Sequence, residues 1–437
     1  MILLLERKVV LMEISVKKSK ISGQVEIPGS KSHTIRAIFI AALASGTSTI
    51  KMPLISEDTV AALRAASILG AWIKRGDDTV WRISGTGGHL LQPAGVINME
   101  NSGTGLRLFT AMAALGDFKV RFDGDDSLRT RKMGSLLEAL SAMGAKVESA
   151  NGLCPLSVTG PIRGREVVVD GKTSQFLSAL LLVAPLLEDP TTIHVSKLNE
   201  KPYVHITLDW LKRQDIKVKF DDGMTCFEVP GGHKYKPFST LIPVDFSTAA
   251  FPLLAAAVTG GEVKIPNLDF DDLQGDKAVF DYFAKMGVKV TQGQHITTIK
   301  GPRKLKAFDL DLNATPDALP VMAVAAACAD GVSYLRNVPQ ARIKETDRIA
   351  CMTAELRKMG VSVEELEDGM VITGGKLKGC ADLQSYKDHR IAMSLAVAGL
   401  AAEGVSVIHD AECAAVTYPA FVENFQAAGA DFTISEF

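Results

Sequence analysis

The sequence predicts an α/β fold of two domains, and two observations carry this prediction. A segment of about 72 residues recurs six times along the 437-residue chain, each time with one amphipathic helix, one buried helix and several short strands. The most linker-like stretch, residues 230–243, is rich in proline and glycine and separates the first three copies from the last three. A chain of this length allows two to four domains, so two groups of three copies are compatible with it.

Each amphipathic helix ends at a turn residue that precedes a strand. The six helix–turn–strand segments are residues 63–75, 136–149, 208–220, 279–292, 352–365 and 421–434. Their turn residues recur every 69 to 74 residues, at Gly70, Gly144, Asp215, Gly287, Gly360 and Gly429. Glycine is expected where a helix ends in a left-handed residue, so these positions mark helix ends.

The other helix of each copy is apolar on nearly all sides, which predicts a buried helix. These six segments are residues 37–44, 109–115, 176–186, 249–258, 319–329 and 391–400. A small turn and a β-branched strand follow each of them. A TIM barrel would need eight shorter βα units of roughly 30 residues. A dinucleotide-binding domain would need a glycine-rich fingerprint that the sequence lacks, so neither fold fits.

Composition and charge exclude several classes of protein. With 48 basic and 50 acidic residues, the chain is a poor candidate for sequence-independent nucleic-acid binding. The six cysteines show no CxxC spacing, which predicts reduced thiols rather than a zinc site or a redox motif. Residues 1–12 lack the features of a signal peptide, and we expect a surface extension or an early start codon there. No apolar run is long enough to span a membrane. Together with the charge balance and the reduced thiols, this leads us to expect a cytoplasmic protein without metal, membrane or nucleic-acid partners.

One polar residue near the start of each buried helix lies at the same position in every copy of the repeat. These residues are Ser32, Ser102, Ser174, Ser247, Asp317 and His389. The repeat symmetry predicts that they lie at the same end of their domains. Helix N-termini carry partial positive charge and free N–H groups, which favour anions. N-capping alone could account for Ser102, Ser247 and Asp317.

Cations also lie at these helix starts, where the helix dipole opposes them. The buried helices begin near Lys31, Arg36, His389 and Arg390. The segments before the amphipathic helices add Arg129, Arg131, Lys132, Lys201, Arg342, Lys344 and Arg348. Any one of these could be a solvated surface charge, but their shared position predicts an anion-binding site. The carboxylates Asp317, Glu345, Asp347 and Asp388 lie among them and are either ion-pair partners or acid–base groups.

Seven motifs, in this order and spacing, resemble the 5-enolpyruvylshikimate-3-phosphate synthase family over about residues 20–425. They are PGSKSHTIRA, NSGTGLR, SLRTRKM, TSQFLSALL, TPDALP, RIKETDR and DHRIAM. The resemblance implies an inverse α/β barrel-like fold in which each domain holds three βαβαββ units and the domains close on the substrates. It implies a first domain of residues 29–243, a second of residues 1–28 and 244–437, and linkers near 20–28 and 237–245. We expect a monomer.

The resemblance also implies an activity that needs no cofactor or metal. The family transfers the enolpyruvyl group of phosphoenolpyruvate to the 5-hydroxyl of shikimate 3-phosphate, by addition and elimination, and glyphosate is expected to compete with phosphoenolpyruvate. The implied catalytic residues are Lys31, Asp317 and Glu345. Shikimate 3-phosphate would contact Lys31, Ser32, Arg36, Thr173, Ser174, Gln175, Tyr203, Asp317 and Lys344. Phosphoenolpyruvate would contact Lys31, Asn101, Gly103, Arg131, Gln175, Arg348 and Arg390.

Several positions depart from the family pattern. Glu200 stands where a serine commonly helps to hold the phosphate, and Val416 where many members carry a lysine that touches phosphoenolpyruvate. The other departures are Leu108, Lys132, Thr173 and Gln340. Glu200 and Val416 leave open a non-catalytic anion-binding paralogue. The sister enolpyruvyl transferase, which acts on UDP-N-acetylglucosamine and carries a reactive cysteine in a mobile loop, also stays open because it shares the fold.

Overall fold

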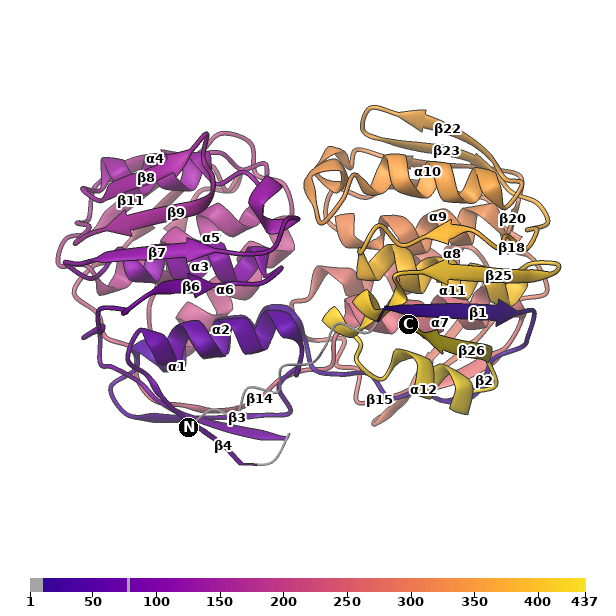
Figure 1. Ribbon diagram of the computed structural model, residues 1–437, viewed down its shortest axis with the longest axis horizontal. Coiled ribbons are helices and arrows are strands. Elements are labelled where there is room, and N and C mark those ends of the chain that lie inside the picture. The colour runs from indigo at the N-terminus through magenta and orange to yellow at the C-terminus, as the bar shows by residue number, and fades with distance from the viewer. Residues whose placement is uncertain (1–10, 77–78) are drawn as a thin grey trace. The chain divides into compact units, whose positions relative to one another are not determined.

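The computed structural model describes residues 11–76 and 79–437, and the chain divides into two compact units (Figure 1). The N-terminal unit contains Pro28–Asp245 together with Asp269–Gly275. The C-terminal unit contains the described residues up to Ile27, Phe246–Leu268 and Asp276–Phe437. The prediction for residues 1–12 falls mostly outside the described residues, although Met12 begins a strand.

The strands of both units form four-stranded sheets with a single repeated order. In each sheet the first strand pairs parallel with the second, and the remaining pairs are antiparallel. In the N-terminal unit, the first sheet has the order β14 (Ser239–Leu241), β3 (Thr47–Lys51), β5 (Val80–Ser84), β4 (Trp72–Arg75). The second has the order β6 (Val96–Asn98), β7 (Lys119–Asp123), β9 (Leu153–Thr159), β8 (Lys146–Ala150). The third has the order β10 (Glu166–Val169), β11 (Thr191–Val195), β13 (Cys226–Val229), β12 (Lys219–Phe220). In the C-terminal unit, the first sheet has the order β2 (Ser22–Gln24), β15 (Glu262–Pro266), β17 (Ile296–Lys300), β16 (Lys289–Gln292). The second has the order β19 (Asp309–Asp311), β21 (Val332–Arg336), β23 (Gly369–Thr373), β22 (Ser362–Leu366). The third has the order β24 (Leu383–Gln384), β25 (Val405–His409), β1 (Met12–Lys17), β26 (Asp431–Glu436). A two-stranded ladder, β18 (Leu305–Lys306)–β20 (Ala329–Asp330), joins the latter unit.

Two helices accompany each sheet, as the repeat predicts. The apolar helices are buried: α1 (Lys31–Leu43), α3 (Gly103–Ala113), α5 (Ser174–Val183), α7 (Phe246–Thr259), α9 (Leu319–Ala327) and α11 (His389–Ala401). The amphipathic helices each keep one face in solvent: α2 (Glu57–Ile68), α4 (Gly134–Ala142), α6 (Lys201–Arg213), α8 (Ala278–Lys285), α10 (Arg348–Lys358) and α12 (Phe421–Ala427). The predicted α/β class and its sixfold repeat are therefore confirmed.

The turn residues after the amphipathic helices have the predicted backbone conformation. Five are glycines with φ between 83° and 113°, and the sixth, Asp215, has φ 60°. A left-handed residue lets the chain reverse into the following strand, and glycine adopts this conformation without a Cβ penalty. The helix ends were predictable because this signal is local to each turn.

Both predicted linkers contain a strand that completes a sheet. Residues 239–241 form β14, parallel to β3, and residues 22–24 form β2, parallel to β15. β1 pairs with β25 and β26, so N-terminal residues complete sheets of the C-terminal unit. Pairing satisfies backbone N–H and C=O groups that a free linker would leave to water.

The segment Asp269–Gly275 packs with the N-terminal unit, which the sequence did not predict. Asp272 accepts from Nε2 of His33 at 3.3 Å, and the Gln274 side chain donates to the carbonyl oxygen of Val244 at 3.0 Å. His33 also accepts from the indole N–H of Trp210 through Nδ1 at 3.1 Å. These bonds hold the segment beside the start of α1.

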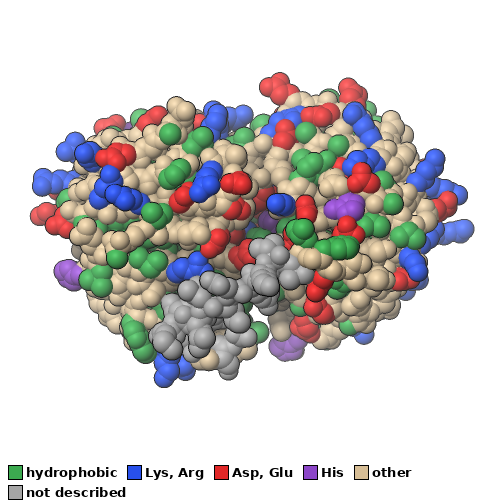
Figure 2. Space-filling model, in the orientation of Figure 1, with side chains coloured by type: hydrophobic (Ala, Val, Ile, Leu, Met, Phe, Trp, Pro, Cys, Tyr) green, Lys and Arg blue, Asp and Glu red, His purple; other side chains and the backbone are tan. Residues whose placement is uncertain are grey.

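Lys and Arg side chains are intermingled with Asp and Glu on the face of each unit that Figure 2 shows, in keeping with the balanced charge. Within residues 11–76 and 79–437, no helix has the length and apolarity that crossing a membrane requires.

Candidate active site

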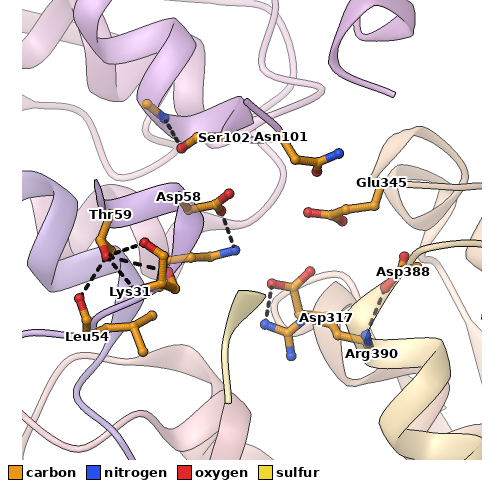
Figure 3. Close-up of polar contacts among 12 residues, drawn as sticks. Lys31, Leu54, Asp58, Thr59, Asn101, Ser102, Asp317, Glu345, Asp388 and Arg390 are labelled. Atoms are coloured by element: carbon orange, nitrogen blue, oxygen red, sulfur yellow. Dashed lines mark hydrogen bonds and ion pairs between the residues drawn. The ribbon is translucent and has the colours of Figure 1, made fainter. Parts of the chain in front are cut away.

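All five predicted site residues of the C-terminal unit are joined by ion pairs. Arg348, the first residue of α10, donates to Asp317 at 2.8 Å and to Glu345 at 2.6 Å. Asp317 lies in a 3₁₀ turn, η4 (Pro316–Ala318), just before α9. It is also paired with Arg390 at 3.3 Å, drawn in Figure 3, and with Lys344 at 3.6 Å. We call Asp317, Lys344, Glu345, Arg348 and Arg390 the C-unit cluster.

A buried carboxylate fixes the orientation of the Arg348 guanidinium. Asp388 accepts from Nε at 2.7 Å and from Nη2 at 3.2 Å, and both side chains are at most 1% exposed. Asp388 is also the N-cap of α11, where it accepts the backbone N–H of Arg390 at 2.9 Å (Figure 3). One carboxylate thus joins the start of α10 to the start of α11.

The charges of this cluster shift the pKa of Asp317 strongly. Burial alone would raise that pKa, but the nearby cations, Arg390 foremost, outweigh burial and hold it far below its ordinary value. Burial would lower the pKa of the Arg348 guanidinium, but the surrounding carboxylates outweigh burial and raise that pKa. Both groups are therefore charged at neutral pH.

In the N-terminal unit, Lys31 begins α1 and is paired with a carboxylate that sequence reasoning missed. Lys31 Nζ lies 3.0 Å from Oδ2 of Asp58, in the first turn of α2 (Figure 3). Asp58 is 6% exposed and Lys31 17%, so the lysine end is the more accessible one. A signal for Asp58 existed: it occupies, in the first copy of the repeat, the helix start that Arg348 occupies in the fifth.

Two predicted residues for phosphoenolpyruvate meet at the start of α3. The guanidinium of Arg131 donates to the side-chain oxygen of Asn101, and that amide donates to Asp125 at 2.6 Å. A Cβ on Gly103 would lie 2.8 Å from Nη1 of Arg131 and 3.0 Å from Nη1 of Arg107. Arg107, which sequence reasoning did not assign, also donates to the side chain of Gln175.

Arg36 is buried and its bonds tie three helices together. It donates to Thr207 at 2.9 Å, to Ser178 at 3.4 Å, and to the carbonyl oxygens of Ser32 and Tyr203. Burial lowers its pKa to about 10. The structure thus brings Ser32, Arg36 and Tyr203 together. The Arg36 side chain contacts the backbone carbonyl groups of Ser32 and Tyr203 and not their side chains in these hydrogen bonds.

Several other predicted features do not contribute to these clusters. Ser102 caps α3 as predicted and accepts from the backbone N–H of Gly105. Ser247 is the second residue of α7 rather than its N-cap, and Asp317 is paired with cations. Arg129 forms a half-exposed pair with Asp123, and Arg342 bonds Asp347 and Glu365. Lys132 and Lys201 are exposed. Across residues 11–76 and 79–437, no group of three His, Cys, Asp or Glu side chains is placed to hold a metal ion.

The sequence matches the family model described as EPSP synthase (3-phosphoshikimate 1-carboxyvinyltransferase) over residues 16–425. The chain belongs to the EPSP synthase family. It is 48% identical over 427 residues to the 3-phosphoshikimate 1-carboxyvinyltransferase of Acetivibrio thermocellus, covering 97% of this chain and 100% of the relative. The protein of that name from Methanosarcina acetivorans is 43% identical, with 96% of this chain and 98% of the relative covered.

Solved structures agree with the membership in the EPSP synthase family. The EPSP synthase of Acinetobacter baumannii superposes with a TM-score of 0.83 at 30% identity, covering 97% of this chain and 100% of that one. The enolpyruvyl transferase NikO of Streptomyces tendae superposes with a TM-score of 0.79 at 18% identity and so supports the fold alone. The inverse α/β barrel-like fold of the family is thereby confirmed.

Two departures from the EPSP synthase pattern can now be placed in the structure. Val416 ends η6 (Ala411–Val416) and offers no charge. Glu200 is 1% exposed, and its carboxylate accepts the backbone N–H of Ser174 at 3.2 Å and the hydroxyl of Ser174 at 2.8 Å. The acid therefore bonds a residue that the resemblance assigns to shikimate 3-phosphate.

Proposed function

We propose that the protein transfers the enolpyruvyl group of phosphoenolpyruvate to the 5-hydroxyl of shikimate 3-phosphate and releases phosphate. The observation that carries the proposal is the C-unit cluster, in which Asp317 and Glu345 share one buried guanidinium. Cations of this kind can hold phosphates and carboxylates, and two carboxylates can move protons. The names of the relatives with 40–48% identity support the same reaction.

In this proposal the two carboxylates carry out the proton transfers. In the addition step, Glu345 in its protonated form gives a proton to the methylene carbon of phosphoenolpyruvate, the 5-hydroxyl oxygen bonds to the adjacent carbon, and Asp317 accepts the hydroxyl proton. In the elimination step, Glu345 removes a proton from the new methyl group while the bond from carbon to the phosphate oxygen breaks, and the departing phosphate takes the proton that Asp317 had accepted. Lys31 contacts both substrates and assists the proton transfers.

Asp317 can act as a base only after its cations have been drawn toward the substrates. A carboxylate whose pKa is held far below its ordinary value is a weak proton acceptor. The phosphate and carboxylate groups of the substrates compete with Asp317 for Lys344 and Arg390. Substrate binding should therefore raise the pKa of Asp317, which couples the chemistry to the presence of both ligands.

We infer the other roles from the resemblance. Shikimate 3-phosphate is held by Lys31, Ser32, Arg36, Thr173, Ser174, Gln175, Tyr203, Asp317 and Lys344, and phosphoenolpyruvate by Lys31, Asn101, Gly103, Arg131, Gln175, Arg348 and Arg390. The bond between Arg131 and Asn101 supports a shared role for those two. We also infer that the protein works in the cytoplasm as a monomer.

A phosphate-release assay tests the proposal. Release that requires both phosphoenolpyruvate and shikimate 3-phosphate is the expected result. Tight binding of both compounds without turnover would instead favour the non-catalytic paralogue, the second candidate, which Glu200 and Val416 favour. Release only with UDP-N-acetylglucosamine would favour the sister transferase.

Three of the six thiols are poor candidates for the reactive cysteine of the sister transferase. Burial raises the pKa of Cys154 and of Cys328 to about 12, and that of Cys351 to about 11. A reactive cysteine needs a lowered pKa, because the thiolate is the nucleophile. None of these three thiols has that property.

Replacing Gly103 with alanine should raise the KM for phosphoenolpyruvate about ten-fold, the effect of weakening one charge-assisted hydrogen bond. The added methyl group would push the ends of Arg131 and Arg107, which can move without unfolding the chain. Steady-state kinetics with each substrate varied in turn measure the effect. Gly134→Ala is the matched control, since a Cβ there meets no atom within 4 Å. Equal KM values for the two variants would contradict the prediction.

A further inference from the structure

We propose that Glu200 is an internal anion that occupies the phosphate position of the shikimate 3-phosphate site, so that the substrate must displace it. The proposal rests on the proposed function, since it concerns the group that binds beside Ser174. It makes Glu200 a residue that sets the affinity for shikimate 3-phosphate in the proposed reaction.

The contacts of Glu200 resemble those expected of a bound phosphate oxygen. One carboxylate oxygen, Oε2, accepts both the backbone N–H and the hydroxyl of Ser174. Ser174 is the first residue of α5, and the free N–H groups at a helix start favour an anion. The carboxylate thus uses two donors that a phosphate at this position would need.

The backbone aims the Glu200 side chain inward. Glu200 precedes the first residue of α6 with φ 57° and ψ 37°, a left-handed conformation that is uncommon for residues other than glycine. Its neighbour Lys201 points elsewhere and donates to the carbonyl oxygen of Gly223 at 3.0 Å. Pairing with that lysine, which would turn the acid away from Ser174, does not occur.

A phosphate and this carboxylate cannot both bind Ser174 in this arrangement. Two like charges competing for the same donors repel each other, and the hydrogen bonds of the carboxylate must break first. The affinity for shikimate 3-phosphate is therefore lowered by the free energy of displacing Glu200. Removing the acid should leave the two donors to the ligand.

Calorimetric titration of wild type, Glu200→Ser and Glu200→Gln tests the proposal. With shikimate 3-phosphate, Glu200→Ser should bind about ten-fold or more tightly than wild type, the effect of two charge-assisted hydrogen bonds no longer opposing the ligand. In turnover, the KM for shikimate 3-phosphate should fall by a similar factor, and the KM for phosphoenolpyruvate should stay unchanged. Glu200→Gln keeps an oxygen that can accept from Ser174, which guards against loss of the fold, and should show a smaller gain.

Glu188→Ser is the matched control. Glu188 is exposed and lies beyond the C-terminal end of α5, a helix about 15 Å long, so this change removes the same charge far from Ser174 at the other end of the helix. It should leave both KM values unchanged.

Binding of inorganic phosphate is a second measurement, and it does not depend on the proposed reaction. Glu200→Ser should bind phosphate measurably more tightly than wild type does. If no variant released phosphate from the two substrates, the proposed function would fail, while this comparison would still decide the role of Glu200. If Glu200→Ser and Glu200→Gln, both folded, bound shikimate 3-phosphate and inorganic phosphate no more tightly than wild type, Glu200 would be a structural partner of α5 and the proposal would be wrong.

Discussion

Replacing Arg348 with alanine should lower the free energy of unfolding of the C-terminal unit by about 3–5 kcal/mol, the usual effect of breaking a buried ion pair. The guanidinium is surrounded by Asp317, Glu345 and Asp388, and the last of these is fully buried. Without Arg348, the buried carboxylate of Asp388 would lose the guanidinium from which it accepts two hydrogen bonds. Turnover should also disappear, because Asp317 and Glu345 would lose the group that orients them.

The tryptophans make this prediction measurable unit by unit. All three, at positions 72, 81 and 210, lie in the N-terminal unit, so their fluorescence during guanidinium denaturation reports on that unit. Far-UV circular dichroism reports on both units. The Arg348→Ala chain should show an early transition in circular dichroism that tryptophan fluorescence does not follow.

Two further variants separate the buried charge from general damage to α10. Arg357 lies on the same helix and donates only to the carbonyl oxygen of Val363 among its described contacts, so Arg357→Ala is the matched control. Adding Asp388→Asn to Arg348→Ala should restore part of the lost stability, since it removes the unpaired charge. If the single Arg348 variant unfolded with wild-type transitions in both signals, the C-unit cluster would not stabilise the C-terminal unit.

The repeated fold was predictable because its signals are local. The left-handed conformation at Gly70 or Asp215 depends on a few neighbouring residues, and a helix that is apolar on all sides has to be buried. The same periodicity placed Asp317 and Arg390 near helix starts, and there the structure has them.

The partners of the site residues were less predictable because they come from distant parts of the chain. Lys31 pairs with Asp58, 27 residues later, and Arg348 with Asp388, 40 residues later. Spacing shows that a charge lies at a helix start, but packing between helices decides which opposite charge it meets. The bond between Glu200 and Ser174 was not predictable for the same reason. From the sequence alone, the neighbouring Lys201 could equally have been the partner of Glu200.

Replacing Glu345 with glutamine should lower kcat by a factor of about 10²–10⁴, the usual contribution of a general acid–base group. Glutamine has nearly the same shape and keeps an oxygen that can accept from Nη2 of Arg348, 2.6 Å away in the wild type. It cannot donate a proton to carbon and take it back. Affinities for both substrates should therefore change only a few-fold while the chemical step is lost.

Hydrogen exchange at the methylene carbon of phosphoenolpyruvate tests this role more directly than turnover does. In heavy water with shikimate 3-phosphate, the wild type should place deuterium on that carbon, because Glu345 exchanges its proton with solvent before it protonates the carbon. Glu345→Gln should not. Glu365→Gln, which removes an exposed partner of Arg342 in the same unit, should behave as the wild type does. Deuterium incorporation by Glu345→Gln at the wild-type rate would show that another group transfers the proton. Lys31 would then be the residue to test, because it is assigned to both substrates and its ammonium can donate a proton.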